Sequence, residues 1–153
     1  MAYSPIEQHS RDLDIFLRDS DKFIHFASAG GMLPEGAVNS DVYNNLVIEE
    51  LSQDNSDSEI EINPNISELL SLTDDDLTDY LASFVEMAKK GFFSYDKSKL
   101  GDFEDQTFHL VAKPKSPIKP NVLYEKFKSF EKIINTQKVF PTEFEVFDIS
   151  EYI

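Results

Sequence analysis

The chain has 153 residues, of which 29 are Asp or Glu and 14 are Lys or Arg, so its formal net charge is −15 at pH 7. The absence of cysteine excludes disulfide bonds, zinc sites built on thiolates and thiol catalysis. A hydrophobic content of 41% predicts a folded chain. No apolar run reaches the roughly 18 residues that a membrane-spanning helix needs. Because the first residues lack a basic head followed by an apolar run, we expect no signal peptide, a cytoplasmic location and no membrane partner.

Two strands are predicted near the N-terminus. Residues 13–18 and 22–28 are rich in β-branched and aromatic side chains, and the polar residues 19–21 form a turn between them. We therefore expect a β-hairpin. Gly30 and Gly31 end the second strand, because glycine permits positive φ.

A helix is predicted to follow Asn39 or Ser40, either of which could be its N-cap. Its apolar residues recur near the spacing of one helical face, and they are Val42, Leu46, Val47 and Leu51. Residues 52–58 are polar and predict a loop, whereas the alternation in residues 59–62 predicts a short strand ended by a proline. Residues 66–72 predict a short helical turn.

The strongest local signal predicts a helix over residues 74–90. Thr73 is a suitable N-cap, and three aspartates follow it in the first turn, where carboxylates complement the helix dipole. The apolar residues then recur every three or four positions, at Leu77, Tyr80, Leu81, Phe84, Val85 and Ala88. Gly91 follows as the residue that ends the helix.

The remaining chain alternates strands and a helix. Residues 92–95 and 107–112 predict strands, and three prolines make residues 113–120 an extended connection. Apolar spacing predicts a helix over residues 121–135, and the alternation in residues 144–149 predicts a last strand.

These elements predict the class α+β, with a mostly antiparallel sheet packed with two or three helices. The composition shows no internal repeat and no domain boundary, so residues 1–153 are expected to form one domain.

The most informative feature is the distribution of charge. Residues 23–88 contain no Lys or Arg and carry 14 acidic residues, which together supply −14 of the formal charge. Such a segment is either a solvated face, which is common, or a surface that attracts a basic partner. We favour the second interpretation, because a field that a partner is to feel should not be neutralised by its own neighbours. The predicted partner-binding residues are Glu49, Glu50, Asp54, Asp57, Glu59, Glu61, Asp74, Asp75, Asp76 and Asp79.

Metal and cofactor sites are not predicted. Residues 54–59 invite comparison with an EF-hand calcium loop, but the required glycine and glutamate positions are occupied by Glu59 and Asn65. Residues 74–76 could hold Mg²⁺, yet consecutive helical residues point in different directions, so helix capping is the better interpretation.

Catalytic residues are not predicted either, and we expect no enzyme. His25 and His109 lie within apolar strand patterns, which favours a structural role for both. No phosphate-binding glycine loop and no serine nucleophile motif is present. The interspersed charges of the C-terminal part do not predict a nucleic-acid-binding patch.

Two stretches, residues 23–34 (FIHFASAGGMLP) and residues 83–96 (SFVEMAKKGFFSYD), resemble small bacterial proteins encoded beside secreted polymorphic toxins. The resemblance implies an immunity protein, for example of a contact-dependent growth inhibition system. Such a protein would bind its cognate basic toxin domain, often a nuclease, and no functional residue carries over from the family. Immunity proteins to nucleases often present acidic surfaces, and charge complementarity speeds their association.

Three functional hypotheses follow. The first is an inhibitor that binds a cationic toxin domain through the acidic surface and occludes its active site. The second is a nucleic-acid mimic of the anti-restriction or anti-CRISPR type, which requires rows of carboxylates at phosphate-like spacing. The third is an enzyme or a metal-binding protein assembled from residues distant in the sequence.

Overall fold

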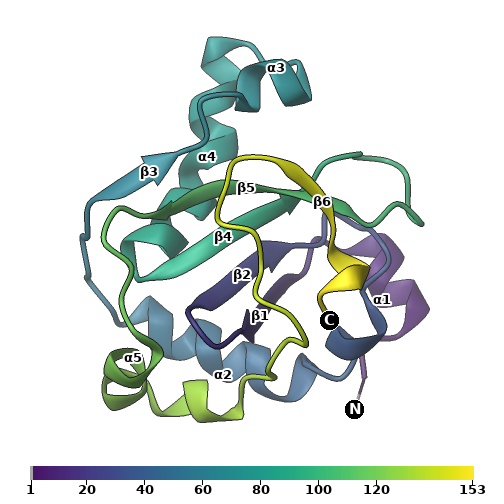
Figure 1. Ribbon diagram of the computed structural model, residues 1–153. Helices are drawn as coiled ribbons and strands as arrows, with labels where there is room; N and C mark the ends of the chain where they lie inside the picture. Colours follow the sequence, from purple (N-terminus) through teal and green to yellow (C-terminus); the bar gives the residue numbers. More distant parts are fainter. Residues whose placement is uncertain (1) are drawn as a thin grey trace.

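A computed structural model describes residues 2–153, which form a mixed six-stranded sheet. The sheet lies between two layers (Figure 1). The strands are β1 (Asp14–Arg18), β2 (Phe23–Ala27), β3 (Ile60–Ile62), β4 (Phe92–Lys97), β5 (Thr107–Pro114) and β6 (Val146–Asp148). The α-helices are α1 (Pro5–Ser10), α2 (Asp41–Ser52), α3 (Ile66–Leu70), α4 (Asp74–Lys89) and α5 (Pro120–Lys126). Three 3₁₀ helices are η1 (Glu35–Ala37), η2 (Lys128–Lys132) and η3 (Ile149–Glu151).

The sheet is mostly antiparallel, as the sequence predicts. Its order is β1-β2-β4-β5-β3, and β6 pairs with β5 beside β3. The predicted hairpin of β1 and β2 is present, and β2 pairs in parallel with β4 after the long connection that contains α2, β3, α3 and α4. The other pairings among the described strands are antiparallel. The α+β class is therefore confirmed.

The two faces of the sheet bury different layers. On one face, Ile24, Phe26 and Tyr95 pack under the C-terminal segment, which crosses the front of the sheet in Figure 1. On the other face, residues of β1, β2, β4 and β5 pack under α2, α4, α5 and η2. Because strand side chains alternate between faces, consecutive residues of β4 belong to opposite layers.

Helix α4 forms as its sequence predicts. The Thr73 side chain accepts a hydrogen bond from the backbone N–H of Asp76 at 3.3 Å, and Gly91 after the helix has φ +106°. Phe84 and Ala88 are buried against β4 and β5. The N-cap, the charged first turn and the glycine therefore fix both ends of this helix.

Helix α2 lies where expected, and Val47 and Leu51 are buried as predicted, but the first turns present a different face. Val42 is 63% exposed and Leu46 is also exposed, whereas Tyr43 and Asn44 are buried. The reason is the outer edge of β1 at Phe16, where no described strand pairs with it. The Phe16 N–H donates to Asn44 Oδ1 at 3.2 Å, and the Tyr43 hydroxyl donates to the Phe16 carbonyl at 3.1 Å. The helix turns two polar side chains inward because they satisfy backbone groups that have no strand partner.

The prediction of one long helix over residues 121–135 is wrong. The chain forms α5 and then the 3₁₀ helix η2, separated by Phe127 in an extended conformation with φ −126° and ψ 104°. This break places the Phe127 ring on that of Phe130, with centroids 4.6 Å apart, and both side chains are buried. Aromatic packing outweighs helical periodicity here.

Two further elements differ from expectation at the chain ends. The last strand is the three-residue β6, shorter than the predicted 144–149, and η3 follows it. Helix α1 was not predicted, although the Ser4 side chain accepts from the Glu7 N–H and the Glu7 carboxylate accepts from the Ser4 N–H. This reciprocal capping box stabilises a helix too short to show periodicity.

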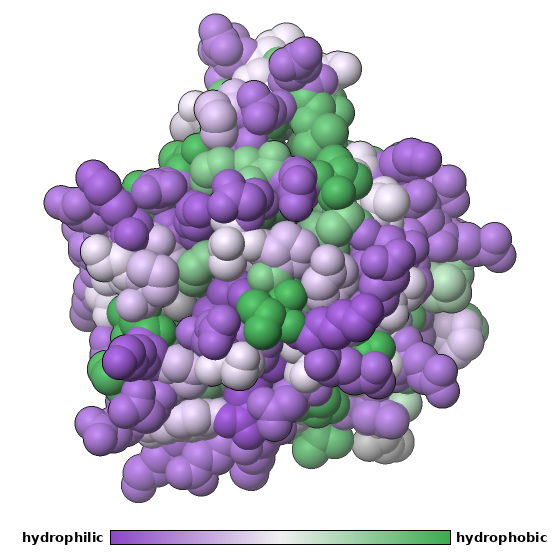
Figure 2. Space-filling model, viewed as in Figure 1, coloured by the Kyte–Doolittle hydropathy of each residue, from purple (hydrophilic) through white to green (hydrophobic). Residues whose placement is uncertain are grey.

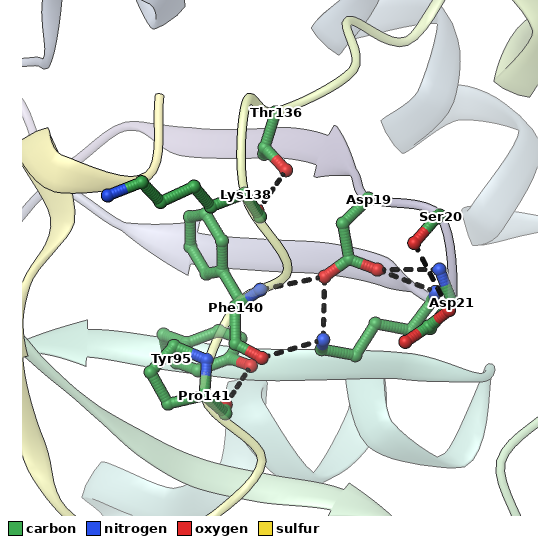
Figure 3. A network of polar contacts seen from close by, with 9 residues as sticks. Asp19, Ser20, Asp21, Tyr95, Thr136, Lys138, Phe140 and Pro141 are labelled. Carbon is green, nitrogen blue, oxygen red and sulfur yellow. Dashed lines mark hydrogen bonds and ion pairs between the residues drawn. The ribbon is translucent and has the colours of Figure 1, made fainter.

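A buried ion pair joins the hairpin to the C-terminal segment (Figure 3). The Lys22 ammonium donates to Asp19 Oδ2 at 2.6 Å and to the Phe140 carbonyl at 2.8 Å. The Phe140 N–H donates to the same Asp19 oxygen at 2.9 Å, and the Tyr95 hydroxyl donates to the Pro141 carbonyl at 2.7 Å. Both charged side chains are at most 3% exposed, so each depends on the other for its burial.

Replacing Lys22 with Met should lower the free energy of unfolding by about 3–5 kcal/mol, because it leaves the Asp19 carboxylate buried without a counter-charge. The double variant Asp19→Asn/Lys22→Met should lose less than the sum of the two single variants. Urea denaturation measures these values, with the exposed Ser20→Ala as the control. A loss below about 1 kcal/mol for Lys22→Met would show that the pair does not hold the segment.

Candidate functional site

The acidic residues of the 49–61 region are largely engaged within the chain. Glu50 accepts hydrogen bonds from the N–H and the hydroxyl of Ser129, whereas Glu49 is exposed. Four others pair with lysines from later in the sequence, and the N–O distances are 2.7 Å for Asp54–Lys126, 3.5 Å for Asp57–Lys89, 3.7 Å for Glu59–Lys115 and 3.9 Å for Glu61–Lys113. The fold thus supplies the neutralising charges that the local sequence lacks.

These ion pairs differ in character. The Asp54 side chain is only 6% exposed; burial raises its pKa, but hydrogen bonds from Lys126 and Ser56 and the charge of Lys126 more than offset this, so the pKa lies below its usual value. Asp57 and Glu59 are 82% and 84% exposed, and such surface pairs contribute little to stability. Asp54 is therefore a structural residue, whereas Asp57 and Glu59 remain accessible to a partner.

The acidic residues at the start of α4 are exposed and not neutralised. Asp74, Asp75, Asp76 and Asp79 form no ion pair with a basic residue within the described residues 2–153. In Figure 1 this end of α4 rises with α3 above the sheet. We call residues 62–79 the α3–α4 projection.

The projection also carries apolar side chains. Ile62 is 41% and Leu69 37% exposed, and Leu70, Leu72 and Leu77 are half-buried. Figure 2 shows hydrophilic residues over the tip of the projection and hydrophobic residues at its base. Unneutralised carboxylates and apolar side chains thus share one protruding surface, the combination that anchors protein interfaces.

A cavity of about 410 Å³ lies where α4 meets the sheet. We call it the α4 cavity, and its lining residues are Asp12, Asp14, Ala27, Ala29, Tyr80, Ser83, Phe84, Asp96 and Leu100. Tyr80 precedes Ser83 and Phe84 by one helical turn, so α4 presents all three side chains to the cavity. Three carboxylates and two aromatic rings therefore meet in one place.

Asp96 is the buried carboxylate of this cavity. The residue is 3% exposed, and the Tyr80 hydroxyl donates to its Oδ2 at 2.6 Å. Burial raises the pKa of Asp96 to about 7, although the hydrogen bonds from Tyr80 and from the backbone of Lys97 oppose the shift. Burial and the charge of Asp96 raise the pKa of the Tyr80 hydroxyl, so this group stays protonated.

His109 extends the network on β5. Its Nε2 lies 3.4 Å from the Tyr80 hydroxyl, and its Nδ1 lies 2.9 Å from the Ser98 hydroxyl. Burial lowers the pKa of His109 to about 4, so the ring is neutral near pH 7. The Tyr80 hydroxyl thus lies between Asp96 and His109, and burial disfavours the charged form of each.

His25 bridges a carboxylate and a hydroxyl, with Nε2 2.7 Å from Asp14 Oδ1 and Nδ1 2.7 Å from Ser94 Oγ. This order of side chains is that of a catalytic triad. Ser94 is fully buried, however, and does not line the α4 cavity, so a substrate cannot reach it. His25 and His109 both lie buried in strands, as the sequence patterns predict.

Sequence reasoning missed the cavity residues. The predicted strand stopped at Tyr95, and Asp96 therefore fell outside it, although Ser94 and Asp96 alternate with the apolar Phe93 and Tyr95. Two polar residues on one face of a buried strand are the available signal. Asp12 and Asp14 flank the start of β1 and Tyr80 lies in α4, and no local pattern unites the two segments.

Among the described residues, no three His, Asp or Glu side chains are close enough together to hold a metal ion. In the same part of the chain, no helix combines the length and the apolar character that crossing a membrane demands. Comparison with protein-family models, curated proteins and solved structures finds no match.

Replacing Asp96 with Asn should stabilise the protein progressively as the pH rises from 4 to 8, relative to wild type. The folded chain holds the Asp96 proton up to about pH 7, whereas the unfolded chain releases it near 3.8, so wild-type stability falls over this interval by about 4 kcal/mol from this group. The variant does not lose this stability, because the Asn side chain does not ionise. His109 acts in the opposite direction in both proteins, because its contribution is lost as the pH falls from 6.5 to about 4.

Urea denaturation of wild type and Asp96→Asn at pH 4.5 and pH 8 measures the difference, with the exposed Asp102→Asn as a control of equal charge change. The groups that face Asp96 are Tyr80, Asp12 and Lys97, and all remain in the variant. An equal difference in stability at the two pH values would contradict a raised pKa.

Proposed function

We propose that the protein is an immunity protein, which binds a cognate basic toxin domain in the cytoplasm through an acidic surface and occludes the toxin's active site. It acts by binding and catalyses no reaction of its own. The proposal joins the resemblance of residues 23–34 and 83–96 to an exposed, unneutralised cluster of carboxylates. A nuclease is the favoured toxin class, because its nucleic-acid-binding groove is basic.

The observation that carries the proposal is the α3–α4 projection. Its aspartates at positions 74, 75, 76 and 79 are exposed, whereas most acids of the 49–61 region are paired with lysines or hydrogen-bonded. Unpaired charge attracts a basic partner over a distance of about 8–10 Å at physiological salt and raises the association rate. The neighbouring Ile62 and Leu69 supply the apolar contact that surface charge alone does not.

This distribution favours the inhibitor over the nucleic-acid mimic. A mimic needs two extended rows of carboxylates without counter-charges, but four of the six acids in the 49–61 region have lysine partners at 2.7–3.9 Å. One compact acidic projection suits the concave basic site of a protein.

The test compares two variants that each remove four negative charges. Asp74→Asn/Asp75→Asn/Asp76→Asn/Asp79→Asn should slow association with the toxin domain about 10–100-fold at low salt and flatten its salt dependence. The matched control, Asp54→Asn/Asp57→Asn/Glu59→Gln/Glu61→Gln, should slow it less, because its carboxylates are already paired. Stopped-flow kinetics from 20 to 500 mM salt measures both rates.

The partner for this experiment is obtained by co-purification with the tagged chain when the neighbouring gene product is co-expressed. Equal slowing by the two variants would remove the α3–α4 projection as the contact surface. A partner released by competing DNA, without toxin activity that the chain inhibits, would contradict the proposal and favour the mimic.

A further inference from the structure

The buried carboxylate of the α4 cavity has no counter-ion. Asp96 accepts hydrogen bonds from the Tyr80 hydroxyl and from the backbone of Lys97, but it forms no ion pair within the described residues. Lys97 is adjacent in β4, yet its side chain lies against Gly31 and its ammonium donates to the Asp105 carbonyl. A carboxylate that is 3% exposed and lines an open cavity without a cation is a costly arrangement for stability alone.

We propose that the α4 cavity binds a guanidinium group. The group can be carried by an arginine of a basic partner, which rests on the proposed function, or by a free small molecule. Its N–H donors would reach Asp96 inside the cavity and Asp12 and Asp14 on its walls, and its planar face would lie against the rings of Tyr80 and Phe84.

The shape and chemistry of the walls select this class of ligand. The centroids of the Tyr80 and Phe84 rings are 5.2 Å apart with their planes at 36°, and both rings line the cavity together with the apolar Ala27 and Leu100. Among the described residues, the carboxylates of the cavity do not form a group that could hold a metal ion. An extended planar cation with five donors can contact separated carboxylates at once, whereas a compact ammonium group cannot.

The entrance of the cavity is also acidic. Asp14 is half-exposed, and its Oδ1 lies 2.7 Å from His25 Nε2, which fixes its orientation. Asp76 precedes Tyr80 by one helical turn, and Asp79 precedes Ser83 by one turn, so the carboxylates of the α3–α4 projection continue toward the cavity along α4. A cation attracted to the projection would therefore meet the cavity on the same side of the helix.

The test titrates the full chain with agmatine, which carries a guanidinium group, by isothermal calorimetry at pH 7 in two buffers of different ionisation enthalpy. We expect one site, and we expect protons to be released, because the bound cation favours the ionised form of Asp96. The titratable and charged groups around Asp96 are Tyr80, Asp12, Lys97, Asp14 on the same cavity and, through Tyr80, His109. The analogue N-(4-aminobutyl)urea, which keeps the ammonium group of agmatine and replaces the guanidinium by a neutral urea, should bind at least about tenfold more weakly.

Asp96→Asn should weaken agmatine binding at least about tenfold, whereas Glu131→Gln, an equal change of charge at an exposed position on η2, should leave the dissociation constant within about twofold. Ser83→Trp, at an exposed residue of the cavity wall, should also weaken binding at least about tenfold by filling the entrance. If Asp96→Asn does not fold, Ser83→Trp tests binding in the α4 cavity instead. Wild-type affinity in a folded Asp96→Asn or Ser83→Trp variant, or equal binding of N-(4-aminobutyl)urea, would overturn the proposal.

The two sources of the guanidinium group are separated by N-acetylarginine amide, an arginine blocked as it is within a chain. Affinity equal to that of agmatine supports a partner's side chain, and at least tenfold weaker binding supports a free small molecule. Because calorimetry needs no toxin, its result is independent of the association kinetics. Agmatine binding by a chain that inhibits no co-expressed toxin would retain the cavity and reject the proposed function, whereas toxin inhibition without agmatine binding would reject the cavity alone.

Discussion

The buried pair of Asp19 and Lys22 holds the front layer of the molecule in place. Asp19 accepts from the N–H groups of its own turn and of Phe140, while Lys22 donates to the Phe140 carbonyl, so one ion pair fixes both ends of a single backbone unit. The Phe140 ring then packs against Tyr95, Phe147 and Tyr152. A C-terminal segment with little regular structure thereby becomes a layer that keeps one face of the sheet from water. Because side chains of a strand alternate between its two faces, Ser94 and Asp96 of β4 point to the opposite face of the sheet.

The local sequence was sufficient to predict an element where all the residues that determine its ends and its buried face lie within or next to it. Helix α4 has its cap, its charged first turn, its apolar face and its terminal glycine within 19 residues, and residues 74–90 were predicted almost to the position. It was insufficient where a distant partner decides the outcome. The face of α2 depends on the outer edge of β1 at Phe16, and the break at Phe127 depends on the packing of its ring against Phe130. Neither partner is visible within the helical window. Periodicity alone therefore predicted two of the four buried positions of α2, and it predicted the wrong length for the later helix.

The same limit applies to the candidate site. The sequence shows correctly that residues 23–88 contain no Lys or Arg, but neutralisation occurs in space. Lysines 113 and 115 come from the neighbouring strand β5 and the residue after it, and Lys126 comes from the end of α5. Of the predicted partner-binding residues, the fold uses Glu50 and Asp54 for its own stability and leaves the aspartates of α4 free. The α4 cavity could not be predicted because its carboxylates come from two distant places in the chain and its buried member looks like the end of an ordinary strand.

The helix dipole of α4 explains why carboxylates without basic partners are tolerated at the start of α4 but not in the 54–59 segment. Asp74, Asp75 and Asp76 lie in the first turn, where the partial positive charge of the helix N-terminus stabilises a carboxylate by about 0.3–1 kcal/mol without any basic residue. The 54–59 segment has no helix or strand and hence no such dipole, and its three acids rely on lysines instead. A helix terminus can therefore present exposed aspartates to a partner at little cost to folding. Because the next turns of the same helix line the α4 cavity with Tyr80 and Phe84, the surface that attracts a cation and the cavity that would hold it are built on one rigid element.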